Sequence, residues 1–269
     1  MDTAAQLQKI VLLNPKGGSG KSTIATNLAA YYASKGLNTA LMDTDPQGSG
    51  MRWLKLRPRN LPPIAAINGF DRPMGVTRSF ALRTPPGTER LIVDTPAALC
   101  AQQMPEVIRD ASAIVVPVLP SDIDTHAASR CIADLLLVGK VHRSERRLVI
   151  VANRARRYTK AFQSLMKFLQ SLRIPVAAVL RDSQAYVRSA ETGMGLHEMK
   201  GALLQEDIDT FRPLLDWLEK RTESLVATDE SAAVSGAPPA DGRESPSVMA
   251  VSDEAAAPVS ASGSFSIVS

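Results

Sequence analysis

Short aliphatic runs alternate with longer amphipathic stretches through the first 222 residues. The runs are continuously apolar, which is typical of strands covered on both faces. They predict strands at residues 10–13, 39–42, 91–93, 113–119, 148–152 and 176–180. The stretches between them predict helices near residues 21–35, 102–110, 123–138, 159–171, 184–192 and 204–221. We therefore expect an α/β fold, a doubly wound and mostly parallel sheet with helices on both faces.

The composition changes near residue 223. Of the 47 residues that follow, 28 are Ala, Ser, Pro or Gly, so this stretch has little apolar area to bury. We expect one folded domain at residues 1–222 and a disordered acidic tail at residues 223–269. The tail holds seven acidic residues and one basic residue, which gives the domain before it a net charge of +10 within a chain of +4. A basic domain indicates a polyanionic partner.

A glycine-rich segment joins the first predicted strand to the first predicted helix. Residues 14–23 read Asn-Pro-Lys-Gly-Gly-Ser-Gly-Lys-Ser-Thr. Glycines let backbone N–H groups turn toward phosphate oxygens, and the helix N-terminus adds partial positive charge. Lys21 would hold the β- and γ-phosphates of a nucleotide, and the Ser22 hydroxyl would ligate Mg²⁺. The expected ATP-binding residues here are Lys16, Gly17, Gly18, Ser19, Gly20, Lys21, Ser22 and Thr23.

Lys16 is a second lysine at the start of this loop. With it the segment resembles the deviant P-loop ATPases of the ParA/MinD family, whose signature is KGGxGK[ST]. In that family the early lysine reaches the nucleotide of a partner subunit. The resemblance implies that Lys16 is catalytic across a homodimer that forms with ATP; the alternative is a solvated surface lysine. Because nine residues precede the first strand, the chain resembles the small ParA type without an N-terminal helix-turn-helix.

Two carboxylate motifs follow the second and third predicted strands. Residues 43–49 read Asp-Thr-Asp-Pro-Gln-Gly-Ser and resemble a segment in which the later acid, here Asp45, orients the attacking water. Asp43 is expected to support the metal. Asp94 ends an aliphatic strand and matches the Walker-B-like acid that reaches Mg²⁺ through water. The expected catalytic residues are Lys16, Lys21 and Asp45, and the expected metal site is Ser22, Asp43 and Asp94.

The C-terminal half supplies weaker candidates. Asn153 resembles the adenine-contacting asparagine of the family, and Asp182 is expected to face the base. Residues 140–200 hold 13 Lys or Arg against four acidic residues. ParA-like dimers bind DNA without sequence preference through basic residues in this half, and such binding needs only phosphate neutralisation. The expected DNA-binding residues are Arg154, Arg156, Arg157, Lys160, Lys167, Arg173, Arg181 and Arg188.

These features together predict a cytoplasmic, nucleoid-associated ATPase with ATP and Mg²⁺ as cofactors. We expect it to position or partition a cargo, either DNA or a protein assembly. A cargo adaptor protein is expected to stimulate hydrolysis, with the Arg- and Pro-rich segment 52–90 as its docking region. No membrane partner is expected.

Two other interpretations stay open at this stage. A MinD-like membrane-associated ATPase would end in a basic amphipathic helix, whereas this chain ends in an acidic stretch. We expect the apolar residues at 214–225 to form a last helix that packs on the core. A nitrogenase-iron-protein-like reductase would need two cysteine ligands for an iron–sulfur cluster. Cys100 fits the first position, but residues 120–122 are Pro-Ser-Asp, and Cys131 is expected to be a small buried residue.

Overall fold

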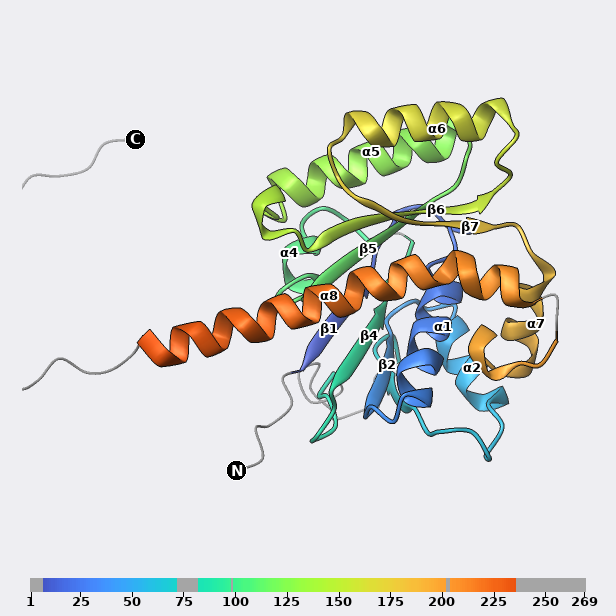
Figure 1. Cartoon of the computed structure of the whole chain (residues 1–269), viewed down its shortest axis with the longest axis vertical. Helices are drawn as coiled ribbons and strands as arrows, with labels where there is room; N and C mark the ends of the chain where they lie inside the picture. The colour runs from blue at the N-terminus through green and yellow to red at the C-terminus, as the bar shows by residue number, and fades with distance from the viewer. Residues whose placement is uncertain (1–6, 72–81, 98, 202–203, 236–269) are drawn as a thin grey trace, which may run out of the picture.

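A single sheet organises the described part of the chain (Figure 1). The computed structural model describes residues 7–71, 82–97, 99–201 and 204–235, and describes side chains as far as residue 225. Within these ranges seven strands, all parallel, lie in the order β3-β2-β4-β1-β5-β6-β7. Their bounds are β1 (Gln8–Leu12), β2 (Thr39–Asp43), β3 (Ala65–Asn68), β4 (Arg90–Asp94), β5 (Ala113–Val118), β6 (Leu148–Ala155) and β7 (Val176–Arg181). The expected doubly wound parallel sheet is confirmed.

Helices cover both faces of this sheet (Figure 1). One face carries α1 (Lys21–Ser34), α2 (Ser49–Leu56), α7 (Gln184–Thr192) and α8 (Gln205–Ser235). The other carries α4 (Met104–Val107), α5 (Asp122–Leu137) and α6 (Lys160–Ser171). Two short 3₁₀ turns, η1 (Arg143–Glu145) and η2 (Leu196–Glu198), join these elements. Because successive side chains of a strand point to opposite faces, the aliphatic runs supply two separate core layers.

All six predicted strands are present, and the described residues add one α-helix and one strand that were not predicted. These are α2 and β3, which follow one another between β2 and β4. β3 has four residues and pairs only with β2 among the described strands, so it lies at the edge of the sheet. Its sequence, Ala-Ala-Ile-Asn, is short and weakly apolar, and only Ile67 is fully buried. A half-exposed edge strand carries too little apolar signal to be recognised from its sequence alone.

The last helix is longer than the sequence predicted. α8 continues to Ser235, so the expected domain boundary at residue 222 falls inside a helix. Residues 236–269 lie outside the described residues. Leu214, Leu215 and Leu218 are buried, as expected for a helix that packs on the core. In Figure 1 the C-terminal part of α8 runs out beyond the sheet and the other helices.

The strand order brings the polar strand ends together. β1 lies between β4 and β5, and Leu12 is in register with Asp94. Asp94 is also in register with Asp43 on β2. Parallel strands end at the same edge of the sheet, so the segment after β1 and both carboxylates meet there. In open α/β sheets this carboxyl edge is where ligands bind.

Candidate functional site

Hydrogen bonds of Asn14 fix the start of the glycine-rich loop after β1. Asn14 is buried, and its Nδ2 donates to the carbonyl of Pro117 at 2.6 Å. Its Oδ1 accepts from the Lys16 N–H at 2.8 Å. Gly18 and Gly20 adopt φ values of 76° and 95°, which residues other than glycine rarely tolerate. The shape of the loop is therefore set by contacts within the chain.

Asn153 braces this loop from β6. Its Nδ2 donates to the carbonyl of Ser19 at 2.8 Å. A Cβ on Gly20 would lie 2.0 Å from the same Nδ2, so a glycine is required for the approach. The amide that the sequence assigned to adenine is thus engaged with the phosphate loop. Asp182, the other expected base contact, lies at the surface and pairs with Arg156, Nη2 to Oδ2 at 2.9 Å.

The loop and the start of α1 line a cavity of about 580 Å³. Lys21 lies at its wall and is 5% exposed. Burial lowers the pKa of its ammonium group, whereas the nearby Asp94 and Asp45 raise it. The cavity therefore places a buried cation at the N-terminus of a helix, which suits a phosphate group. Its lining residues are Gly17, Gly18, Gly20, Lys21, Ser22, Thr23, Asp45, Pro46, Gln47, Ser49, Pro96, Ala97 and Arg154.

Asp94 is a fully buried carboxylate, and neither of its oxygens has a hydrogen-bond partner among the described residues. Burial raises the pKa of this carboxyl to about 7, while the neighbouring Ser22 hydroxyl and Lys21 ammonium oppose that rise. An unpaired buried acid is costly unless something compensates its charge. Carboxylate and hydroxyl oxygens are the donors that Mg²⁺ prefers, so Ser22 and Asp94 fit a magnesium site.

Asp43 is equally buried, but its oxygens are satisfied. Oδ2 accepts from the N–H groups of Gly50 at 2.8 Å and Met51 at 3.1 Å, and Oδ1 accepts from Asp45 N–H at 3.0 Å. Two of these donors belong to the first turn of α2, where an anion is favoured by the helix dipole. Asp43 therefore holds the segment 44–51 through these bonds, and its support of a metal ion stays a prediction.

Asp45 is the acid that this segment presents to the cavity. Its Oδ1 accepts from the N–H of Gln47 at 3.0 Å, which forms a local turn. The turn ends at Gly48, whose φ of 61° starts α2. Asp45 is half-buried and shares the cavity with Lys21 and Ser22, where it can orient a water molecule.

Asp124 is a site residue that the sequence reasoning missed. Its Oδ2 accepts from the Lys16 ammonium, Nζ to Oδ2 at 2.6 Å. The Asp124 side chain is 3% exposed and that of Lys16 is 34% exposed, so the pair joins a buried acid to a partly solvated lysine. Ser121 caps α5 by accepting from the Asp124 N–H at 3.2 Å and also contacts its carboxylate. The sequence signal that could have indicated Asp124 is the Ser-x-x-Asp pattern at residues 121–124, which is typical of a helix N-terminus.

The structure divides the expected DNA-binding residues. Arg154 lines the cavity beside Lys21, and Arg181 pairs with Glu206 and Asp207. Arg156, already paired with Asp182, lies close in sequence to exposed Arg157 and Lys160 at the carboxyl end of β6. Lys167 on α6 and Arg188 on α7 are also exposed.

Arg173 lies at the opposite end of the sheet. It precedes β7 and lines a small hollow together with Arg143 and Arg146. Arg143, Arg146 and Arg173 make no ion pair with any residue in the described ranges. The positive charge of residues 140–200 is therefore split between the two ends of the strands.

The two cysteines have different surroundings. Cys131 is buried within α5, as expected for a core residue, and its burial raises the pKa of the thiol to about 12. Cys100 is exposed. The described residues contain no cluster of His, Cys, Asp and Glu that could hold a metal ion by themselves.

Comparison with known proteins identifies the domain. Residues 10–196 match the model of the CobQ/CobB/MinD/ParA nucleotide binding domain. The maintenance of carboxysome distribution protein A of Gloeobacter kilaueensis is 28% identical over 220 residues, which cover 78% of this chain and 94% of that protein. Its namesake from Halothiobacillus neapolitanus is 24% identical over 181 residues, which cover 67% of this chain and 82% of that protein.

Solved structures share the fold. A plasmid partition protein of Borrelia burgdorferi bound to AMPPNP has a TM-score of 0.58 at 14% identity, and the match covers 78% of this chain and 99% of that one. A variant of Cyanothece McdA in complex with ATP has a TM-score of 0.56 at 14% identity, and the match covers 82% of this chain and 97% of that one. The chain belongs to the CobQ/CobB/MinD/ParA family of nucleotide-binding domains.

Proposed function

We propose that the chain is an ATPase that dimerises around two ATP molecules, binds DNA without sequence preference when dimeric, and positions a cargo. The cargo is a protein assembly, and adaptor-stimulated hydrolysis releases the dimer from DNA. The relatives named for carboxysome distribution favour this class of cargo. The observation that carries the ATPase proposal is a cavity lined by a buried lysine and a serine hydroxyl, both of which neighbour the unpartnered buried carboxylate of Asp94.

Polar residues of the cavity and of the strand ends beside it have roles that their environments support. Lys21 and the glycine N–H groups hold the phosphates. Ser22 and, through water, Asp94 would hold Mg²⁺, which supplies charge neutralisation at the transferred phosphoryl group. Asp45 orients the attacking water, and Asp43 holds the segment that carries Asp45. No second base accompanies Asp45 among the described lining residues, so we expect slow intrinsic turnover.

The present contact of Lys16 defines what the dimer proposal requires of this residue. Its ammonium is held by Asp124 within the same chain. To reach a partner's nucleotide it must exchange this carboxylate for a phosphate, which offers a comparable anion. Dimerisation would therefore be coupled to the release of one ion pair.

The DNA-binding proposal rests on exposed charge. Arg157 and Lys160 belong to the group at the carboxyl end of β6, and Arg173 belongs to the group at the other end. Either surface would neutralise phosphates and release counterions, so affinity would fall steeply with salt.

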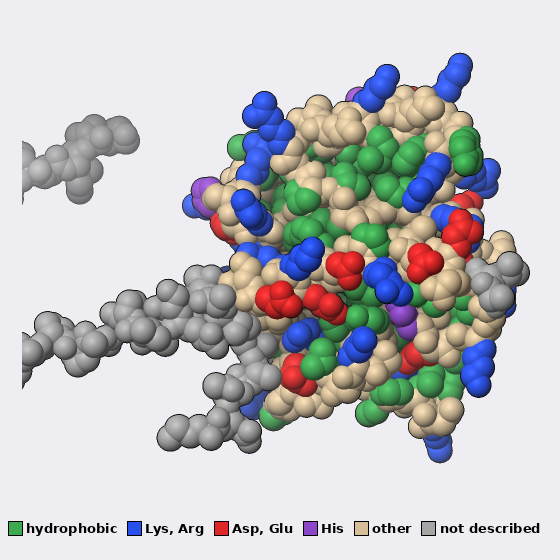
Figure 2. Space-filling model, in the orientation of Figure 1, with side chains coloured by type: hydrophobic (Ala, Val, Ile, Leu, Met, Phe, Trp, Pro, Cys, Tyr) green, Lys and Arg blue, Asp and Glu red, His purple; other side chains and the backbone are tan. Residues whose placement is uncertain are grey.

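The face that carries α8 is less suited to DNA. Figure 2 shows acidic side chains gathered along this helix with some Lys and Arg side chains among them, whereas Lys and Arg side chains alone project from the margin above α5 and α6. Acidic groups close to a phosphate backbone would oppose binding, so the basic surfaces at the strand ends are the better candidates. No helix in the described ranges is long and apolar enough to cross a membrane.

One experiment tests the function as a whole. ATP turnover is measured with and without duplex DNA over a salt series, for the full chain and for Lys21→Ala and Asp45→Ala. We expect turnover in the unaltered chain and none in either variant, with the Asp45→Ala dimer retained on DNA. Turnover that persists in Asp45→Ala would refute the water-orienting role.

A further inference from the structure

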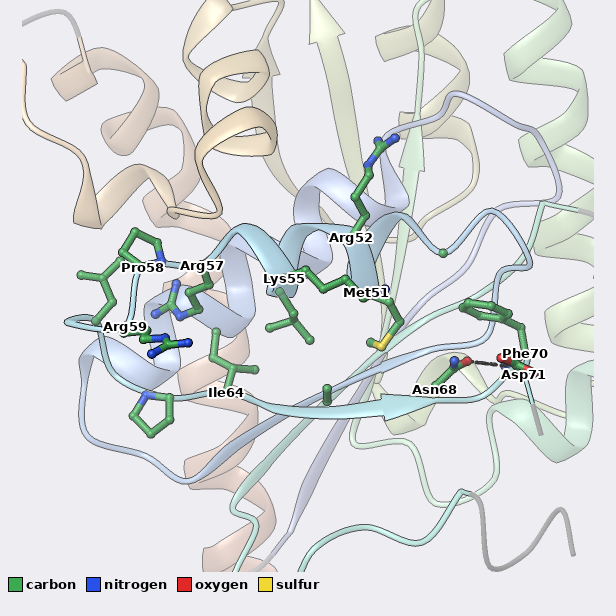
Figure 3. Close-up of a pocket in the computed structure, with 15 residues that line it drawn as sticks. Met51, Arg52, Lys55, Arg57, Pro58, Arg59, Ile64, Asn68, Phe70 and Asp71 are labelled. Carbon is green, nitrogen blue, oxygen red and sulfur yellow. Dashed lines mark hydrogen bonds between the residues drawn. The ribbon is translucent and has the colours of Figure 1, made fainter. Parts of the chain in front are cut away.

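A large groove lies between α2 and the edge strand β3 (Figure 3). Its volume is about 850 Å³, which exceeds that of the nucleotide cavity. Met51 points from α2 toward β3, and Phe70 stands at the end where β3 finishes. We call this hollow the β3 groove. Its apolar lining comes from Met51, Leu54, Pro58, Leu61, Pro63, Ile64, Ala66 and Phe70.

The strand beside the groove has an open edge. β3 pairs with β2 on one side, and no described strand pairs with its other side. An edge strand presents unpaired backbone N–H and C=O groups to any chain that lies along it. Ala66 and Asn68 line the groove at alternate positions, and the exposed Ala66 leaves the backbone uncovered. This combination suits an extended segment that adds to the sheet.

The charge around the groove selects the kind of segment. Arg52, Lys55 and Arg59 line it, are exposed, and form no ion pair with any described residue. Arg57 differs, because its side chain is 6% exposed and its charge is compensated by Glu198, Nη2 to Oε1 at 2.5 Å. Among the described lining residues the one acid is Asp71. The rim is therefore positive, with Arg52 directed away from β3 (Figure 3).

The groove and the nucleotide cavity share a short segment of chain. Gly48 and Met51 line the groove, whereas Gln47 and Ser49 line the cavity. Phe70 packs so closely on Gly48 that an added Cβ would lie 3.0 Å from its Cζ. The N–H of Gly48 in turn donates to the carbonyl of Asp45 at 2.8 Å. An occupant that moves Phe70 or Met51 would therefore shift the segment that holds Asp45.

We propose that the β3 groove docks an extended acidic segment of a partner protein, which adds to the sheet as a strand beside β3. Apolar side chains at alternate positions enter between Met51 and Ala66, and acidic residues at the flanks face Lys55 and Arg59. This rests on the proposed function and deepens it, since it names the surface for the hydrolysis-stimulating adaptor. The docking itself needs no ATP hydrolysis.

The test uses the full chain and a defined probe. The probe is a fluorescent peptide of alternating valine and threonine with two acidic residues at each end, and binding is followed by polarisation. Lys55→Glu/Arg59→Glu should weaken binding at least tenfold. Lys200→Glu/Lys220→Glu reverses the same amount of exposed charge elsewhere and should leave affinity unchanged. A probe that is N-methylated at alternate amides cannot complete a ladder and should not bind.

Each other result overturns the proposal. An equal loss of affinity for the probe in both double variants would show that binding is a general charge attraction. Equal binding of the N-methylated probe would exclude strand addition. No saturable binding would remove the site. Stronger binding of a peptide of residues 241–254 in competition would make this chain's own segment the occupant. The Asp45→Ala variant should bind the probe normally, so failure of docking and failure of hydrolysis are distinguishable.

Discussion

At the residue scale, two neighbouring acids have opposite surroundings. Asp43 and Asp94 are in register on adjacent strands, and both are fully buried. Asp43 accepts three backbone N–H bonds, while Asp94 accepts none from the described residues. The first carboxylate is satisfied by its own loop, whereas the second has no hydrogen-bond partner within the described residues. The same residue type thus has satisfied surroundings on one strand and unsatisfied surroundings on the next.

Asp94→Asn should change stability in a pH-dependent way. The pKa of Asp94 in the folded protein is about 7, above its ordinary value, so its ionisation opposes folding. The free-energy cost of ionising Asp94 in the folded protein grows as pH rises from about 4 to about 7, and it reaches its full value above about pH 7. In protein free of nucleotide and magnesium, the gain in the free energy of unfolding from Asp94→Asn should therefore be about 2–3 kcal/mol larger at pH 8 than at pH 5.

Denaturant unfolding at the two pH values measures this difference. Asp182→Asn is the control, because Asp182 is exposed and its substitution should change stability little at either pH. A gain from Asp94→Asn that does not depend on pH would contradict the assignment of a buried, ionising carboxyl.

Lys16 and Asp124 should affect dimerisation in opposite directions. Lys16→Ala is expected to remove ATP-dependent dimers and leave nucleotide binding largely intact. Asp124→Asn frees the Lys16 ammonium and should lower the ATP concentration for half-maximal dimerisation several-fold, since a partly exposed ion pair is worth about 1 kcal/mol. Light scattering over an ATP titration measures both. Dimers that persist in Lys16→Ala would refute its role across the interface.

The site residues could be predicted where a sequence motif lies directly at the end of a predicted strand or at the start of a predicted helix. Lys21, Ser22 and Asp94 stand at strand ends or a helix start, and they converge as expected. The contacts of Asn153 with Ser19 and of Asp124 with Lys16 could not be predicted from the sequence. Each joins residues more than 100 positions apart, and their geometry depends on how the sheet packs against the helices.

At the element scale, α2 is held by a buried ion pair at its C-terminal end. Both ends of the Arg57 guanidinium contact Glu198, and its Nη2 and Nε also donate to the carbonyl of Pro62. The two side chains are 6% and 3% exposed. Neither α2 nor this pair follows from a pattern of apolar positions, because the anchor is polar and distant in sequence.

Arg57→Ala should be strongly destabilising. It leaves the buried Glu198 carboxylate uncompensated, for which a loss of about 3–5 kcal/mol is expected. Arg59→Ala removes an exposed cation that has no ion pair with the described residues, and should change the free energy of unfolding by less than about 0.5 kcal/mol. Thermal and denaturant unfolding compare the two variants. Similar effects would mean that the pair does not anchor α2. Arg57→Ala/Glu198→Ala should recover part of the loss.

At the scale of the whole molecule, the net charge combines two unequal parts. Residues 223–269 are acidic, and the chain before them is basic. Since α8 continues to Ser235, a truncation after residue 222 would cut through a helix. The composition changes near residue 223, which lies inside this helix. A change in composition therefore did not locate the end of the helix.

Ending the chain after Ser235 should strengthen DNA binding at low salt. The truncation removes four acidic residues and one basic residue, so less negative charge competes with DNA phosphates for the basic surfaces. We expect a several-fold gain in affinity at low salt that disappears at high salt. Replacing Asp241, Glu244, Asp253 and Glu254 with Asn or Gln tests charge without shortening the chain. Unchanged affinity in both would show that the stretch does not compete.

The central position of β1 also orders events during synthesis. β1 is the first strand made, but its partners are β4 and β5, which end at Asp94 and Val118. An emerging chain therefore carries an unpaired apolar strand until β4 is complete at Asp94, and one edge of β1 stays unpaired until β5 is complete at Val118. Such long-range parallel pairing is slow and exposes aggregation-prone surface. The nascent protein should depend on chaperones early, and that dependence should end once β5 has emerged.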